Sequence, residues 1–272
     1  MTIEDMPEAM QLKDAAGWNQ TTSDWARFLS ASPEGCFVAE REGRVVGTAT
    51  SIVYEGRLAW IGMVIVDPQY RGQGIGTALL ERAVCSLDSR SVLCMKLDAT
   101  PQGKPVYEKF GFVSEYDTER WMLKRRRRAN SAGKASAEIE DVLRLDREIF
   151  GADRSGILRS LTEAAPDFTL VARQEAGVAG YTFGRRGSRA DHLGPWMARG
   201  EDVAAMLLDE FLNCSSRELV FVDCLRRNPW AVSLLRARGF EFSRPLTRMF
   251  RGKNQYAGRP ELLCAVLGPE FG

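Results

Sequence analysis

The sequence has 272 residues, which is enough for one large domain or two of ordinary size, and we expect two. Hydrophobic residues make up 44% of the chain and charged residues 27%, a globular composition that excludes wholesale disorder. Lys and Arg number 37 against 36 Asp and Glu. The resulting net charge of +1 gives no overall attraction to nucleic acid or to an anionic membrane, so we expect neither as a partner.

The cysteines and the single histidine exclude further classes. Six cysteines are scattered without a CxxC pair, mostly among apolar neighbours, which is typical of buried free thiols in a reducing compartment. No stretch approaches the ~20 apolar residues that a membrane helix needs, so we expect a cytoplasmic protein. One histidine cannot build a His-rich metal cage, and we expect no metal site. We interpret His192 as an ordinary loop or strand-edge residue without a chemical role.

The first half predicts one α/β unit. Residues 5–30 predict helices that end where Pro and Gly interrupt residues 32–35. Two β-rich runs, 36–41 and 44–52, are joined by Glu42-Gly43 and predict a hairpin. The remaining elements are an apolar central strand at 58–66, a helix from Ile75 to Leu87, a strand at 92–97, a short helix at 105–110 and a last strand at 121–123.

Residues 125–137 are basic, small and polar, and they predict a linker between domains at 1–124 and 138–272. The run of five cations at residues 124–128, which leads into this segment, is either a solvated linker or a nucleic-acid contact. After it the order of elements begins again: a helical segment at 138–161, a hairpin at 170–173 and 178–183, a strand at 219–222, a helix at 229–238, and a closing strand at 261–267 that could complete either sheet. We interpret this order as a tandem duplication.

A glycine-rich turn lies between the strand at 58–66 and the following helix. The turn reads Arg71-Gly72-Gln73-Gly74-Ile75-Gly76, and small residues at a helix N-terminus bring backbone N–H groups close to a phosphate. A turn that only packs the helix on the sheet is the alternative. The run from Val64 to Leu80 closely resembles motif A of the GCN5-related N-acetyltransferase (GNAT) family, [Q/R]-x-x-G-x-[G/A], which Arg71, Gly74 and Gly76 match. Residues 105–112 look like the YxxxGF motif of the same family.

The resemblance implies an α/β fold of two tandem GNAT-like domains, each with a mixed, mostly antiparallel central sheet flanked by helices. It implies acetyl-CoA as acyl donor. The pyrophosphate-binding loop would comprise Arg71, Gly72, Gln73, Gly74, Ile75, Gly76 and Thr77. The strand that pairs with the pantetheine arm would comprise Met63, Val64, Ile65 and Val66.

Acyl transfer from a thioester needs an uncharged amine, a donor to the developing oxyanion and a proton for the departing thiolate. The resemblance assigns the proton donor to Tyr107 and the oxyanion donor to a backbone N–H near Val64 or Ile65, whereas a tyrosine that only packs on the sheet is the alternative. Residues 60–63 contain no carboxylate that could act as a base. Asp98 either holds an ammonium or relays its proton, or it caps the next turn.

Residues 17–25 fall where the resemblance places one wall of the acceptor site. Trp18, Asn19 and Gln20 are the candidate acceptor contacts, because tryptophan and amide groups shape a pocket that is apolar on one side and polar on the other. The alternative is that Trp18 and Trp25 anchor a helical hairpin to the core.

The second half lacks both motifs. Residues 193–202 stand where the phosphate loop is expected and contain no R-x-x-G-x-G, and Leu235 takes the place of the tyrosine. We therefore predict a catalytic first half, a degenerate second half that shapes the acceptor side, and acetyl transfer to a primary amine of a small molecule or amino acid. A protein N-terminal or lysine acetyltransferase, and a CoA-binding regulator without turnover, are the alternatives. The sequence leaves open whether the chain forms a homodimer.

Overall fold

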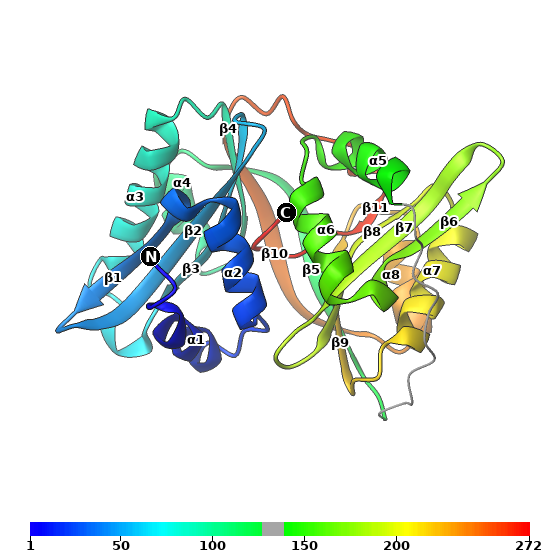
Figure 1. Ribbon diagram of the computed structural model, residues 1–272, viewed down its shortest axis with the longest axis horizontal. Helices are drawn as coiled ribbons and strands as arrows, with labels where there is room; N and C mark the ends of the chain where they lie inside the picture. The colour runs from blue at the N-terminus through cyan, green and yellow to red at the C-terminus, as the bar shows by residue number, and fades with distance from the viewer. Residues whose placement is uncertain (127–138) are drawn as a thin grey trace.

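The protein consists of two α/β units that share one sheet, as the computed structural model shows for residues 1–126 and 139–272 (Figure 1). Most of the predicted linker lies outside these ranges. Arg125, its first residue, does not behave as a solvated linker: its backbone N–H donates to Glu218 O at 2.8 Å and its guanidinium donates to Leu212 O at 2.8 Å. The first unit therefore ends docked against the second.

The N-terminal unit follows the predicted order. Its elements are α1 (Met6–Ala15), α2 (Thr22–Ala31), β1 (Cys36–Arg41), β2 (Arg44–Tyr54), β3 (Leu58–Val66), α3 (Ile75–Ser89), β4 (Cys94–Ala99), α4 (Lys104–Lys109) and β5 (Val113–Lys124). The predicted hairpin and the strand at 58–66 are confirmed. The last strand is longer than predicted because neighbouring strands pair along both of its edges and satisfy its backbone, despite its many polar residues.

The C-terminal unit repeats the same order, which confirms the duplication. Its elements are α5 (Glu140–Phe150), α6 (Ser155–Ala164), β6 (Leu170–Gln174), β7 (Gly177–Arg186), β8 (Asp191–Ala198), α7 (Glu201–Cys214), β9 (Leu219–Leu225), α8 (Ala231–Ala237), β10 (Glu241–Gly252) and β11 (Leu263–Ala265). The single helical segment predicted at 138–161 is two helices, because the chain turns at Gly151. No helix within the described ranges is long and apolar enough to cross a bilayer.

The strands of the described ranges form a single eleven-stranded sheet in the order β1-β2-β3-β4-β10-β5-β9-β11-β8-β7-β6. All pairs are antiparallel except β3–β4 and β8–β9. The two units exchange their long last strands: β10 of the second unit pairs with β4 of the first, and β5 of the first pairs with β9 of the second. The mixed, mostly antiparallel sheets are thus confirmed, but neither unit completes its sheet alone.

One hydrophobic core spans both units. Trp60 and Phe28 of the N-terminal unit share a buried cluster with Phe150 and Phe271 of the C-terminal unit. Phe28 and Phe271 stack with ring centroids 4.6 Å apart, and Phe271 is fully buried. In Figure 1 the C-terminus accordingly lies at the centre of the molecule, between the two units. Aromatic side chains of this size contribute about 1.5–3 kcal/mol each on full burial, so the contact between the units resembles a domain interior.

Candidate active site

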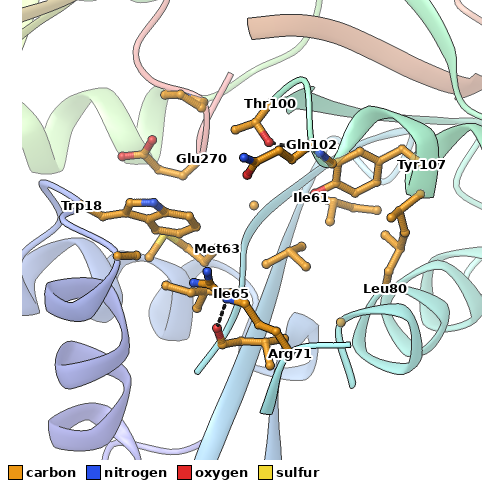
Figure 2. A pocket seen from close by; sticks show the side chains of 18 of the residues that line it. Trp18, Ile61, Met63, Ile65, Arg71, Leu80, Thr100, Gln102, Tyr107 and Glu270 are labelled. Carbon is orange, nitrogen blue, oxygen red and sulfur yellow. Dashed lines mark hydrogen bonds between the residues drawn. The ribbon is translucent and has the colours of Figure 1, made fainter. Parts of the chain in front are cut away.

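A cavity opens where two parallel strands separate. β3 and β4 pair only through Leu58–Trp60 and Cys94–Lys96, and beyond these residues the strands diverge. The cavity between them has a volume of about 950 Å³. Figure 2 shows Tyr107 on one side of it, Trp18 and Glu270 on the other, and Arg71 near its lower end. A space of this size is in the range of ligand sites.

The phosphate loop expected from the sequence lines the cavity. Gly72 and Gly74 have φ values of +76° and +82°, and a Cβ added to either would meet no atom within 4 Å. Gly74 is the N-cap of α3, whose first turn carries backbone N–H groups without helical partners. The loop therefore offers open space and donors together, which fits a pyrophosphate. Of the loop residues named above, only Gln73 is absent from the cavity wall.

The wall formed by β3 contains a backbone irregularity. Met63 has a φ of +51°, and the pairing with β2 shifts register between Thr48 and Thr50. The Thr48 hydroxyl donates to Met63 O at 2.7 Å and holds this bulge. A non-glycine residue in this region costs on the order of 1–3 kcal/mol, and such strain is common at ligand sites. Met63, Val64, Ile65 and Val66 all line the cavity.

Tyr107 lies on α4 and faces the cavity (Figure 2). Its ring packs edge-on against Phe112, with centroids 6.2 Å apart. Burial raises the pKa of Tyr107 to about 12. The phenol therefore keeps its proton at neutral pH and can serve as a donor.

Asp98 also reaches the cavity, but its carboxylate is occupied. Both oxygens accept from the Arg248 guanidinium on β10, at 3.0 and 2.9 Å. The side chain of Asp98 is fully buried in this pair. This contact joins the exchanged strand to β4, and it is distinct from the three roles considered for Asp98, which were to hold an ammonium, to relay its proton or to cap a turn.

The three residues expected to contact the acceptor separate in the structure. Trp18 and Gln20 line the cavity. Asn19 does not: its amide accepts from the backbone N–H groups of Arg189 and Ala190, both at 2.9 Å, and donates to Ala190 O at 3.0 Å. Asn19 therefore joins the N-terminal unit to the β7–β8 loop. Trp25 is fully buried in the core, as the alternative interpretation held.

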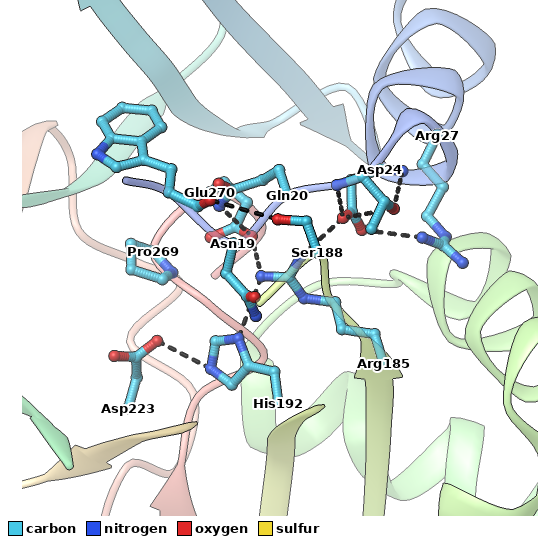
Figure 3. A network of polar contacts seen from close by, with 12 residues as sticks. Asn19, Gln20, Asp24, Arg27, Arg185, Ser188, His192, Asp223, Pro269 and Glu270 are labelled. Atoms are coloured by element: carbon cyan, nitrogen blue, oxygen red, sulfur yellow. Dashed lines mark hydrogen bonds and ion pairs between the residues drawn. The ribbon is translucent and has the colours of Figure 1, made fainter. Parts of the chain in front are cut away.

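A buried polar network crosses between the units beside the cavity (Figure 3). We call it the interface network and define it as Asp24, Arg27, Arg120, Arg185, His192, Asp223 and Glu270. Arg185 pairs with Asp24 at 2.9 Å and also with Glu270. Arg120 binds both oxygens of Asp223, at 2.8 and 2.7 Å. Buried charges of this kind require complete pairing to be tolerated.

His192 belongs to this network, which corrects its interpretation as a loop or strand-edge residue. It lies in β8, is fully buried, and has its Nε2 3.0 Å from the Asp223 carboxylate and its Nδ1 3.1 Å from Arg185. Burial lowers the pKa of His192 more than Asp223 raises it, so the ring is neutral at neutral pH. Burial alone would raise the pKa of Asp223, but Arg120 and His192 hold it far below its ordinary value.

Several cavity residues have no signature in the sequence. Glu270 accepts from Gln20 Nε2 at 2.9 Å, while its Oε2 is buried without a hydrogen-bond partner in the described chain. The backbone of Glu270 approaches β3 closely because Gly62 has no side chain: a Cβ there would lie 2.8 Å from Glu270 O. Arg120, Arg244, Leu246 and Pro269 complete this end of the cavity. Arg120 belongs to β5 of the N-terminal unit, whereas the exchanged strand β10 brings Arg244 and Leu246 to the cavity and the C-terminal tail brings Pro269.

The second unit has closed the corresponding gap. β8 and β9 also pair through only three residues, but β11 then inserts between them and pairs with both. Residues 193–198, expected in a loop, belong to β8, and only Arg199 and Gly200 join it to α7. Eight residues separate β3 from α3 in the first unit. β11 therefore occupies the gap that corresponds to the cavity of the first unit.

The fold and the cavity are those expected of a GNAT acetyltransferase, and comparisons with family models identify the same family. A GNAT acetyltransferase domain model matches residues 32–114, and a second matches residues 142–265. The chain belongs to the GNAT acetyltransferase family and carries two tandem domains, and the reaction of this family is acyl transfer from acetyl-CoA. The described residues contain no group of three or more His, Cys, Asp or Glu side chains that could hold a metal ion.

Individual relatives cover between about half and nearly all of the chain. Holothin acyltransferase from Pseudoalteromonas sp. is 26% identical over 263 residues, covering 95% of this chain and 88% of that protein. The uncharacterized N-acetyltransferase YitH from Bacillus subtilis is 29% identical over 159 residues, 56% of each chain. Among solved structures, an acetyltransferase candidate from Pyrococcus horikoshii has a TM-score of 0.83 at 24% identity, covering 100% of this chain and 94% of that one. This likeness shows the shared fold.

Proposed function

We propose that the protein transfers the acetyl group of acetyl-CoA to a primary amine of a small molecule or amino acid, in the cavity between β3 and β4. The observation that carries this proposal is the continuity of one cavity from the open glycines of the loop to Tyr107 and Glu270. The loop residues and Met63–Val66 would hold the coenzyme, which supplies the acetyl thioester. The far end of the cavity is left for the acceptor.

Tyr107 and Glu270 supply the two proton-transfer groups. Glu270 binds the acceptor ammonium and first takes one of its protons, and the uncharged amine that results attacks the thioester carbonyl. Tyr107 gives its proton to the sulfur as the C–S bond breaks. The ammonium loses two protons. One leaves through Glu270 to solvent, and the other leaves the nitrogen after the attack and replaces the proton that Tyr107 gave to the sulfur.

The loop assignment is tested by a glycine substitution with a matched control. Gly74→Ala puts a methyl group into the open cradle at φ +82°, and we expect the Kd for acetyl-CoA to rise about tenfold or more in calorimetry. Gly43→Ala carries the same backbone penalty, about 1–2 kcal/mol, at φ +73° in the β1–β2 turn, which is not part of the cavity wall. We expect its Kd to equal that of the parent. Equal Kd values for all three proteins would remove the loop from the site, and no binding by the parent protein would overturn the proposed function.

A further inference from the structure

Arg244 is a cation in the cavity wall without a protein partner. It is half-buried on β10, its side chain makes no hydrogen bond or ion pair with any residue of the described ranges, and its Nε is shielded from solvent. Burial lowers its pKa, and the charge of Arg120 adds to this effect. A buried polar group without a partner costs about 1–3 kcal/mol, more when it is charged. The charges of Asp223 and Glu270 attract Arg244 without forming an ion pair with it, and burial outweighs their effect on its pKa.

The position of Arg244 in the sheet makes the unpaired charge more unfavourable. Arg244 lies directly opposite Arg120 in the β10–β5 ladder, and like charges in facing positions are destabilising. Arg120 is neutralised by its two bonds to Asp223. Arg244 has no such counter-ion, so the ladder keeps a free guanidinium aimed at the cavity.

The surrounding charges leave Arg244 uncompensated. The interface network balances itself, because three arginines face three carboxylates and His192 is neutral. Arg244 is therefore an excess positive charge at the acceptor end. A simple amine would bring its ammonium to Glu270 and add a second positive charge beside it. An acceptor with an anionic group removes this conflict and provides the missing partner.

We propose that Arg244 binds an anionic group of the acceptor, so that the acceptor is a small primary amine that carries a carboxylate or a phosphate. This inference rests on the proposed function. Glu270, which already pairs with Arg185 and accepts from Gln20, lines the same cavity as Arg244 without forming an ion pair with it. Arg244 is therefore available for the anionic end of such a molecule. Glu270 and Arg244 both come from the C-terminal unit, which thereby selects the acceptor for the site of the N-terminal unit. Guanidinium groups suit carboxylate and phosphate equally, because both offer two oxygens in a plane.

The test uses acceptors that differ only in the anion. The full-length protein is assayed by thiol release from acetyl-CoA with common amino acids, each against its amide, and with phosphoethanolamine against ethanolamine. The amides carry the more easily deprotonated amine, so amine reactivity alone favours the neutral member. We expect kcat/KM to favour the anionic member in the carboxylate or the phosphate series, and the series that responds identifies the anion. Calorimetry of the same pairs on the protein saturated with CoA gives the preference without turnover.

Arg244→Gln is expected to lower kcat/KM for the anionic member about 10- to 100-fold, whereas kcat/KM for the neutral member should not fall and should rise if anything, because the charge that opposes its ammonium is gone. Arg244→Lys should restore part of the loss. The variant breaks no contact of the fold, and Arg90→Gln, at the exposed end of α3, controls for the loss of one positive charge. Acetyl-CoA binding without any preference for the anionic member, in turnover or in calorimetry, overturns this inference and leaves the proposed function intact. An equal loss for both members of a pair also overturns it.

Discussion

The segment 1–126, produced alone, is expected to remain unfolded or to aggregate, with no cooperative thermal transition and no heat on mixing with acetyl-CoA. In the whole protein β10 covers the edge of β4 and lies between β4 and β5. Without the C-terminal unit, both strands lose that partner, and an unpaired strand edge promotes association between chains. Trp60 and Phe28 would also lose their contacts with Phe150 and Phe271.

Co-production of segments 1–126 and 139–272 provides the control. The two pieces together contain every strand of the shared sheet, so we expect a stable complex with a single thermal transition and acetyl-CoA affinity close to that of the intact chain. Circular dichroism and calorimetry measure both properties. A folded, acetyl-CoA-binding segment 1–126 would show that the exchanged strand is dispensable.

Tyr107→Phe is expected to lower kcat by about 10²- to 10⁴-fold, the usual contribution of a general acid, while the Kd for acetyl-CoA stays the same. The substitution removes only the hydroxyl, and the ring can still pack against Phe112. Steady-state kinetics and calorimetry separate the two effects. Tyr256→Phe, outside the cavity wall, is the control for loss of a phenol and should keep the kcat of the parent.

The role of Tyr107 as general acid also predicts how kcat depends on pH. A phenol ordinarily loses its proton near pH 10, but burial raises the pKa of Tyr107 to about 12. A general acid works in its protonated form, so its contribution is complete below the folded pKa and is lost as the pH rises through it. We expect kcat to show no decline as the pH passes 10. A decline centred near 10 that is absent in Tyr107→Phe would contradict the raised pKa, and full activity of Tyr107→Phe would remove it from the mechanism.

The local elements of the fold could be predicted because their signals are local. The Glu42-Gly43 turn, the apolar run at 58–66 and the glycines before α3 each specify one element through a few neighbouring residues. The exchange of β5 and β10 has no such signal. Either strand can pair with partners from its own unit or from the other, and only the packing of the whole chain decides between them.

The residues of the candidate site also divide into those that local sequence motifs predict and those that only the folded chain brings together. The phosphate loop, Tyr107 and the β3 wall follow from motifs whose residues are close in sequence. His192, Glu270 and Arg244 carry no motif, and each acquires its position from a contact over a long sequence separation, such as Gln20 with Glu270. Asn19 was expected in the cavity, but its amide bonds to the backbone of Ala190 instead. The residues around Asn19 in the sequence do not distinguish an amide that lines the cavity from one that bonds to a distant backbone.

The C-terminal segment that contains β11 serves both units. β11 pairs with β8 and β9 of the second unit, and the chain runs directly from it into residues 266–272, where Glu270 accepts a hydrogen bond from Gln20 of the first unit. One short segment therefore both fills the gap between β8 and β9 and forms part of the wall of the cavity between β3 and β4. We expect substitutions at Pro269 and Glu270 to change which acceptor binds without altering the glycine-rich loop, more than 180 residues earlier.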